Sequence, residues 1–530
     1  MARFLAALLL LLPAPALADA ISARPEAVAV TIYRDGSMTS QDLAQLGADD
    51  THGLALVVET RTVDLPAGRT RVRFEGVADG IIPESAAVTG LPGAIVERNF
   101  DYDLLGPGSI LQRFVGETVK VVRTNPRTGR AVEETAILRS GPDGVALDFS
   151  GRIEALRCSG GAEKLVFDQV PADLADRPTL SVVASAPAPG RYTVQVSYLT
   201  VRLDWAADYI ARIGPDGTTL ALSGWITLAN RSGMSFSNAP TSVVAGNLSR
   251  VEVVLPDVTT PHLNLRCWPM GTTHSGWYRP VNGEPMPPPA PPMVMGGMMD
   301  KSASTVSEMV VTGAKIAVES QLGDYKQYTL PEPTTVAARQ TKQVMFLTQP
   351  VVKFETVYGY SVQPNDDGHI EDEGDPVASN IVLRFDNKLD RGLGRALPAG
   401  MMHVMLSDGV RQQFAGEYRV ERDVPVGEPF EVKIGRTSDV TVTPDVVDRI
   451  TTRRHGRDHL HVEMQVRITN AKSAPALVEI RETRTGTSSF KVTAESAGHG
   501  LKAGDPLWRI PIPANTDRTF TYTVEYDVAD

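Results

Sequence analysis

Apolar and polar residues alternate with a period of two through most of this chain, and a 3.6-residue period is nearly absent. In the segment HLHVEMQVRI, every second residue from Leu460 to Ile468 is apolar, and the residues between them are polar. The segment RTFTYTVEYDV near the C-terminus repeats this pattern. Because successive side chains of a strand point to opposite faces, such segments predict half-buried β-strands.

Turn signals separate these segments at short intervals. The tetrads Leu-Pro-Ala-Gly and Gly-Pro-Asp-Gly each occur twice. Proline presets the backbone angle of a turn, and glycine adopts the positive φ that other residues resist. Many short strands with such turns indicate an all-β fold of several sandwiches and small barrels. Very little helix is expected, because only the segments 40–46 and 172–175 suggest one.

Length and shifts in composition divide the chain into units. At roughly 100–200 residues per domain, 530 residues correspond to about three or four domains. Proline runs and paired glycines fill residues 280–306, which therefore predict a disordered linker. The predicted units are a signal peptide (1–18), an N-terminal β domain (19–108), a small SH3-like β-barrel (109–170), the first part of a β-sandwich (171–279), a Pro/Met-rich linker (280–306), the second part of that sandwich (307–440) and a C-terminal β-sandwich (441–530).

The N-terminus has the features of a cleaved signal peptide. Arg3 precedes an apolar run from Phe4 to Leu12, and Ala16-Leu17-Ala18 provides the small-x-small pattern that signal peptidase recognises. Cleavage is expected after Ala18 or Ala20. The apolar run is shorter than the about 20 residues that a membrane-spanning helix needs. We therefore expect a periplasmic or secreted protein without stable membrane insertion.

Charge and cysteine content narrow the choice of partners and chemistry. Lys+Arg 52 against Asp+Glu 63 gives a net charge of −11, which argues against nucleic acid as a partner. The chain has two cysteines, Cys158 and Cys267. In an oxidising compartment an even count favours a disulfide between them. Two separately buried thiols are the alternative.

A series of segments, in order along the chain, resembles exported bacterial proteins related to mucoidy inhibitor A. They are VTIYRDG, TVDLPAGRTRVRFEGV, IIPESAAVTG, DWAADYIARI, TLANRSG, VVAGNL, FDNKLDRGLGRALPAG, FAGEYRV and RITNAKSAPALVEIRE. The resemblance runs in pieces over residues 28–528. The long coiled coil that many members carry is missing, and residues 109–170 stand in its place. The resemblance implies export and an all-β architecture, and it assigns no catalytic residue because the family has no established activity.

Known catalytic motifs are absent from the sequence. It contains no Walker or Rossmann glycine motif, no HExxH, no CxxC and no G-x-S-x-G, and no cofactor is expected. Soft ligands gather at His262, Cys267, Met270 and His274, shortly before a series of methionines. Thiolate, thioether and imidazole groups suit Cu(I). The alternative is a cystine flanked by aromatic packing.

Aromatic side chains follow the second cysteine. Trp268, Trp277 and Tyr278 lie between the predicted first sandwich part and the linker. Aromatic rings with polar tips are enriched at interface hot spots, so these three residues predict a recognition patch. The competing interpretation is that the rings pack over the predicted disulfide.

Two further clusters carry candidate metal ligands. His459 and His461 share one strand face with Glu463, a spacing that can hold zinc or copper. Four positive charges nearby favour a solvated strand face instead. The acidic loop 364–376 offers the oxygen ligands that calcium prefers, but their order does not fit an EF-hand loop. An exposed, solubilising loop is the favoured interpretation.

The sequence favours a non-enzymatic function in the bacterial envelope. We expect a binding or scaffolding module whose partner is an envelope protein or a surface polymer, because sandwiches offer loops and strand edges to partners. One alternative is a hydrolase of envelope polysaccharide or peptide, which would need two carboxylates about 5–10 Å apart in a cleft or a nucleophile beside a base. Periplasmic copper binding is the other alternative.

Overall fold

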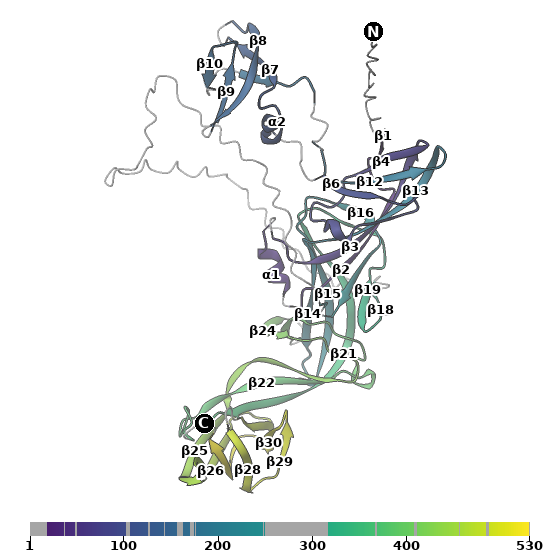
Figure 1. Ribbon diagram of the computed structural model, residues 1–530. Coiled ribbons are helices and arrows are strands. Elements are labelled where there is room, and N and C mark those ends of the chain that lie inside the picture. Colours follow the sequence, from purple (N-terminus) through teal and green to yellow (C-terminus); the bar gives the residue numbers. More distant parts are fainter. Residues whose placement is uncertain are drawn as a thin grey trace, which may run out of the picture.

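The structure is a computed structural model, and it describes most of the chain. The described residues are 18–36, 38–47, 50–101, 107–125, 128–141, 144–155, 163–169, 174, 176–246, 248–249, 316–365, 368–407, 411–454, 456–483 and 487–528. Strands hold 65% of the described residues and helices 4%. The predicted all-β fold with very little helix is therefore confirmed (Figure 1).

A four-stranded sheet lies near one end of the molecule, and a seven-stranded sheet extends from there toward the middle (Figure 1). In pairing order, the four-stranded sheet contains β1 (Ala18–Ser22), β4 (Gly68–Glu75), β12 (Thr179–Ala186) and β6 (Glu97–Asp101). The seven-stranded sheet contains β18 (Val318–Leu322), β19 (Tyr325–Thr329), β17 (Thr241–Ala245), β2 (Ala27–Tyr33), β3 (Leu54–Leu65), β13 (Gly190–Thr200) and β5 (Ala87–Thr89). The alternating pattern predicted which face of each strand is buried. It did not predict which strands pair, because partners such as β3 and β13 come from distant parts of the chain.

The strand pairing does not follow the expected boundary near residue 171 between the small barrel and the first sandwich part. Strands β12 and β13 pair with β4, β6, β3 and β5, which belong to the N-terminal sheets rather than to the following unit. Asp101 at the end of β6 lies opposite Thr179 at the start of β12. Residues 102–178 are thus inserted between two neighbouring strands of one sheet.

The insertion contains a five-stranded sheet with a core of its own. Its pairing order is β10 (Ile153–Ala155), β9 (Gly144–Asp148), β8 (Ala131–Gly141), β7 (Thr118–Thr124) and β11 (Glu163–Val166). Val119, Val121, Leu138 and Leu147 are buried together between these strands. The small core explains how about sixty residues form a separate packed unit.

A thirteen-stranded sheet continues to the other end of the molecule (Figure 1). Its path is β24 (Gln412–Val420), β23 (Gly400–Ser407), β14 (Leu203–Ile213), β15 (Thr219–Asn230), β21 (Gln340–Val362), β22 (Val377–Asp386), β25 (Pro429–Arg454), β26 (Arg457–Asn470), β31 (Thr516–Val528) and β28 (Thr487–Glu495). Beside this path lie β27 (Ala476–Glu482), β30 (Asp505–Ile512) and β29 (His499–Lys502). A separate pair joins β16 (Phe236–Ala239) to β20 (Thr334–Val336).

Two very long strands connect successive units of this sheet. The first part of β21 pairs with β15, and its last part pairs with β22 and β27. The first part of β25 pairs with β22, and its second part pairs with β26. Each unit therefore continues into the next through hydrogen-bonded main chain rather than through a loop.

The first part of the long sheet curls until its edge meets a distant strand. Strand β24, at the end of the sheet, contacts β25. The two strands approach closely at Gly416, where a Cβ atom would lie 2.1 Å from the carbonyl oxygen of Ile434. Glycine is needed at this position because no side chain fits there. The strands from β24 to β25 thus enclose a barrel-like core.

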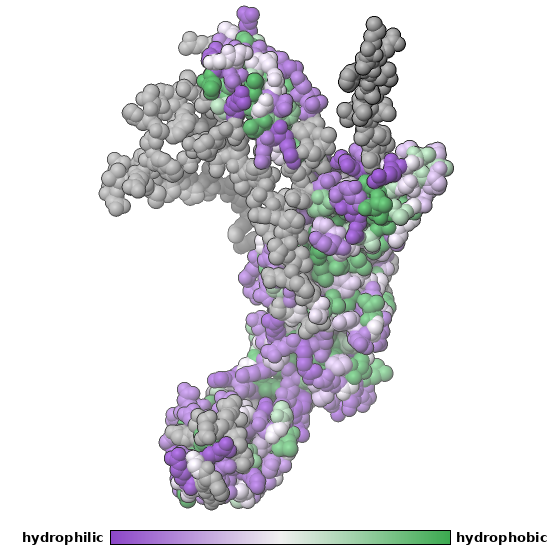
Figure 2. Space-filling view, viewed as in Figure 1, coloured by the Kyte–Doolittle hydropathy of each residue, from purple (hydrophilic) through white to green (hydrophobic). Residues whose placement is uncertain are grey.

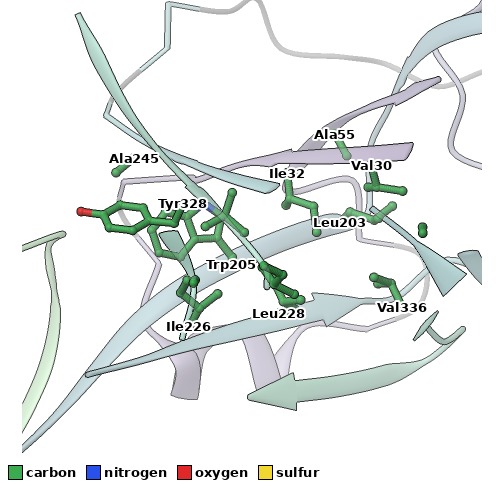
Figure 3. Packing of buried hydrophobic residues seen from close by; sticks show 14 of the residues in the cluster. Val30, Ile32, Ala55, Leu203, Trp205, Ile226, Leu228, Ala245, Tyr328 and Val336 are labelled. Atoms are coloured by element: carbon green, nitrogen blue, oxygen red, sulfur yellow. The ribbon is translucent and has the colours of Figure 1, made fainter. Parts of the chain in front are cut away.

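One continuous core joins the N-terminal sheets to this barrel. Figure 3 shows Trp205 and Tyr328 within it, beside Ile226 and Leu228. The Trp205 side chain is fully buried, and its indole nitrogen donates to the Val244 carbonyl at 3.1 Å. Burial of such large rings contributes a large share of core stability, and the hydrogen bond satisfies the one polar atom.

A second core fills the C-terminal sandwich. The alternate apolar residues of β26, from Leu460 to Ile468, are buried there, as the pattern predicted. Trp508 stacks on Tyr522 with ring centroids 4.3 Å apart, and its indole donates to Glu495.

The few helices are short. The helix expected at 40–46 is α1 (Ser40–Gln45), which begins with a capping box between Thr39 and Asp42. Its Leu43 packs on Ala206 and Ala229 of the barrel. Helix α2 (Pro107–Arg113) was not predicted, because a helix of two turns shows little periodicity. Single 3-10 turns occur at Pro83–Ser85 and Leu389–Arg391.

Three buried asparagines form the same corner at the ends of strands. Asn230, Asn387 and Asn470 are at most 1% exposed. The side-chain amides donate to main-chain carbonyls of Met234 and Val336, of Arg395, Val424 and Pro425, and of Ala474, Ile512 and Pro513, respectively. In each corner at least one of these carbonyls lies in the segment just before the strand that pairs with the asparagine's strand. The same local device therefore fixes three strand pairs.

Candidate functional site

Several predicted site residues lie outside the described residues. These are Cys158, Cys267, Trp268, Trp277, Tyr278, His262, Met270 and His274. The predicted disulfide, the aromatic patch and the copper cluster therefore stay predictions. The predicted linker 280–306 also lies outside the described part of the chain.

The two histidines of β26 are described, and each faces a carboxylate of β31. His459 Nδ1 lies 2.8 Å from Asp527 Oδ1, and His461 Nδ1 lies 3.0 Å from Glu525 Oε1. Glu463, the suggested third ligand, lies opposite Thr523, two residues beyond His461 along β26. Across the described residues, no group of three or more His, Cys, Asp or Glu is arranged to hold a metal ion. The arrangement corresponds to two histidine–carboxylate pairs on a strand face.

The acidic loop is anchored to the C-terminal sandwich. Ile370 is buried in that core, and Asp372 accepts a hydrogen bond from Tyr360 at 3.3 Å. Glu373 lies 3.7 Å from both His369 and Arg449. These carboxylates thus contact protein donors. Asp366 and Asp367 lie outside the described residues.

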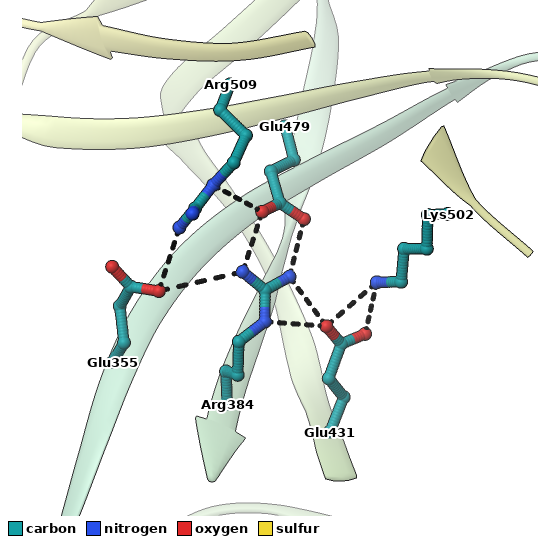
Figure 4. Close-up of polar contacts among 6 residues, drawn as sticks. All are labelled: Glu355, Arg384, Glu431, Glu479, Lys502 and Arg509. Atoms are coloured by element: carbon teal, nitrogen blue, oxygen red, sulfur yellow. Dashed lines mark hydrogen bonds and ion pairs between the residues drawn. The ribbon is translucent and has the colours of Figure 1, made fainter. Parts of the chain in front are cut away.

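The densest charge cluster of the described chain surrounds Arg384, a residue that sequence analysis did not select (Figure 4). Its guanidinium binds Glu431 through Nε at 2.9 Å and Nη2 at 2.6 Å. It also binds Glu479 through Nη1 at 2.7 Å and Nη2 at 2.6 Å. Charge-assisted bonds of this forked kind are among the strongest polar contacts in proteins.

Two further cations complete this cluster, which we call the Arg384 network. Arg509 contacts Glu355 at 3.0 Å and Glu479 at 3.1 Å, and Lys502 contacts both oxygens of Glu431 at 2.6 and 2.8 Å. The six residues come from β21, β22, β25, β27, β29 and β30. The Arg384 network therefore connects the barrel strands to the C-terminal sandwich, and its three cations balance its three carboxylates.

A pocket of about 570 Å³ opens beside the Arg384 network. Its lining combines charged side chains with aliphatic and aromatic ones: Arg384, Tyr418, Val420, Glu421, Arg422, Val424, Pro429, Phe430, Glu431, Glu479, Leu501, Lys502, Leu507 and Arg509. Leu501 is 71% exposed. Figure 2 shows hydrophilic side chains over much of the surface where β22 meets the C-terminal sandwich. The pocket thus offers a partner the exposed apolar side chain of Leu501 among charged side chains.

The contacts in the pocket stabilise the ionised forms of Glu431 and Arg384. Burial alone would raise the pKa of Glu431, but hydrogen bonds from Lys502 and Arg384 outweigh it, so this pKa is lowered. Hydrogen bonds to Glu479 and Glu431 raise the pKa of the Arg384 guanidinium. Burial, with the nearby charges of Glu421 and Glu431, raises the pKa of Tyr418. At neutral pH the Glu431 carboxylate is therefore ionised and bonded.

These contacts bear on the hydrolase alternative. Glu431 and Glu479 both line the pocket, but both bind the same Nη2 of Arg384. A general acid needs a raised pKa, and a nucleophile needs a free oxygen facing its substrate. Neither condition fits Glu431, whose two oxygens are held by Arg384 and Lys502.

Sequence patterns gave only a faint signal for this site. Arg384, Glu431 and Glu479 each lie on the polar side of an alternating strand segment, which normally indicates solvent exposure. These three residues come into contact only because their strands are neighbours in the folded sheet, which the sequence pattern does not reveal. An arginine in the middle of NIVLRFDN was the one local hint.

Comparisons with known proteins do not add an identity. No protein-family model matches the chain, and no curated protein matches it. Within the described residues, no helix is long and apolar enough to cross a membrane.

Proposed function

We propose that this chain is an exported binding or scaffolding protein of the bacterial envelope, periplasmic or secreted, which holds an envelope protein or surface polymer at the pocket beside the Arg384 network. Export is supported by the N-terminal run from Phe4 to Leu12 and the small residues after it. The resemblance to proteins related to mucoidy inhibitor A agrees with this location. No catalytic step is part of the proposal.

The observation that carries the proposal is the pocket between two packed units. Its volume of about 570 Å³ falls in the range of ligand sites, which are usually concave and occur at domain interfaces. The charges of the Arg384 network are already paired with one another, so a partner would gain chiefly from apolar contact with Leu501 and Phe430. The charged side chains around the pocket would then orient the bound partner rather than contribute most of the binding affinity.

Recovery of partners from the native envelope tests this function. The tagged mature protein should retain a specific envelope protein or polymer, and Leu501→Asp should reduce that recovery at least about tenfold. Leu501 is 71% exposed, so the change should leave stability nearly unaltered. Leu389→Asp is the matched control, because Leu389 is 82% exposed and does not line the pocket.

Two results would contradict the proposal. Equal recovery by wild type and Leu501→Asp would remove the pocket from partner binding. Release of soluble sugars or peptides from isolated envelope polymer by the purified protein would support the hydrolase alternative instead.

A further inference from the structure

The first described strand begins where the predicted signal peptide ends. Strand β1 starts at Ala18 and pairs in parallel with β4, from Ala18 opposite Thr70 to Ser22 opposite Phe74. Sequence alone allowed cleavage after Ala18 or after Ala20. These two cuts have different consequences for the fold, because one leaves nearly all of β1 and the other removes most of it.

Burial separates the residues of β1 into two kinds. Ala20 and Ser22 are 6% and 4% exposed, and Ala20 belongs to the core that joins the N-terminal sheets to the barrel. Ile21 is 57% exposed and Asp19 is also on the surface. A cut after Ala20 would leave an unfilled position in the core, and three residues of β4 would lose their β1 partners while keeping those on β12.

Charge gives a second, independent argument against a cut after Ala20. Arg61 is fully buried, forms an ion pair with Glu59 at 2.6 Å and donates to the Ser22 carbonyl at 2.9 Å. A cut after Ala20 would create an ammonium group on Ile21, one residue from that carbonyl. Placing a second positive charge near a buried guanidinium with one carboxylate partner is unfavourable.

We infer that the exported chain is processed between Ala18 and Asp19, so that the mature protein begins at Asp19. In this step the Ala18–Asp19 amide bond breaks and water is added. The Ala18 carbonyl carbon gains the water oxygen and becomes a carboxylate, and both water protons pass to the Asp19 nitrogen, which becomes an ammonium group. That charge lies at the exposed start of β1, beside the carboxylate of Asp19 itself. This inference rests on the export proposed above.

Intact mass measurement of the full chain, expressed with its own N-terminus in a Gram-negative host, tests the site. We expect the exported protein to have the mass of residues 19–530. The mass of residues 21–530 would overturn the inferred site and leave export standing. Retention of residues 1–18 would contradict the proposed export itself.

The structural reason has its own test, in chains made with defined N-termini by removal of a cleavable tag. Residues 21–530 should unfold at a midpoint at least about 3 °C below that of residues 19–530. Residues 20–530, which keep Ala20, should lie close to 19–530 and control for shortening. Equal midpoints for all three chains would overturn the role assigned to Ala20.

Discussion

At the scale of single residues, the most unusual carboxyl group is that of Asp204 beneath α1. It is fully buried, and its Oδ1 accepts the main-chain N–H groups of Asp35 at 3.1 Å and Trp205 at 2.7 Å. Oδ2 has no hydrogen-bond partner among the described residues. Burial outweighs the two hydrogen bonds and raises the pKa of Asp204 to about 7.

This raised pKa predicts a loss of stability as pH rises. Folded Asp204 keeps its proton up to about pH 7, whereas the unfolded chain releases it near pH 4, so stability falls between these values. The wild type should lose roughly 4 kcal/mol over this interval relative to Asp204→Asn, which retains the accepting oxygen. Calorimetric unfolding at pH 4, 5.5 and 7 measures the difference.

Asp216 provides a control of opposite sign. Hydrogen bonds from Thr219 and Thr218 lower its pKa to about 2, so its contribution is lost only as pH falls from about 4 toward 2. Asp216→Asn should therefore leave the interval from pH 4 to 7 unchanged. Identical profiles for wild type and Asp204→Asn would contradict the role of the buried carboxyl group.

Residue-level prediction from sequence succeeded where local pattern decides the outcome. The inward positions of β26 from Leu460 to Ile468 followed from alternation alone. The buried asparagine corners did not, although Asn230, Asn387 and Asn470 stand in segments already quoted for family resemblance. Asparagine normally indicates a turn. The carbonyls that accept hydrogen bonds from these three buried asparagines come partly from distant segments.

At the scale of elements, the contact between β24 and β25 depends on one missing side chain. Gly416 faces the Ile434 carbonyl, whereas Gly435 on the neighbouring strand has nothing within 4 Å of its would-be Cβ. Both glycines have nearly the same φ, +153° and +154°. Backbone conformation therefore affects both positions alike, and only the close approach differs.

This pair gives a matched prediction for closure of the barrel. Gly416→Ala should cost about 2–3 kcal/mol more than Gly435→Ala, because strands in a packed barrel must shift to admit the methyl group. The unfolding midpoint of the barrel transition in calorimetry reports the difference. Equal effects of the two changes would show that β24 and β25 can separate freely.

Strand partners were the main element-level feature that sequence could not supply. Strand β14 pairs in parallel with β23, with Ala207 opposite Gly400, across a long stretch of intervening chain. Periodicity reveals which face of a strand is buried but says nothing about its neighbour. The same limit explains why β12 and β13 were expected in the next sandwich.

At the scale of the whole molecule, the Arg384 network fixes how the barrel meets the C-terminal sandwich. Arg384→Ala would leave Glu479, a 5% exposed residue, with Arg509 as its remaining cation in the network. We expect a cost of about 2–3 kcal/mol, less than for a fully buried pair because Arg384 is partly exposed. Calorimetry should then show a separate, earlier transition for the C-terminal sandwich.

A surface ion pair controls for general loss of charge. Arg467 lies 3.1 Å from Asp517, and both side chains are more than half exposed. Arg467→Ala should cost under about 1 kcal/mol and leave the transitions together. If Arg384→Ala behaved in the same way, the network would not be what couples the two units.

The long strands β21 and β25 also determine how the molecule responds to mechanical load. Each passes through two packed units, so tension is carried from one unit to the next by covalent main chain. Ladder hydrogen bonds lie across the strands. A pull along β21 or β25 therefore loads many of these bonds in shear at once instead of opening them one after another. Unfolding one unit by such a pull therefore requires breaking several ladder hydrogen bonds together rather than singly.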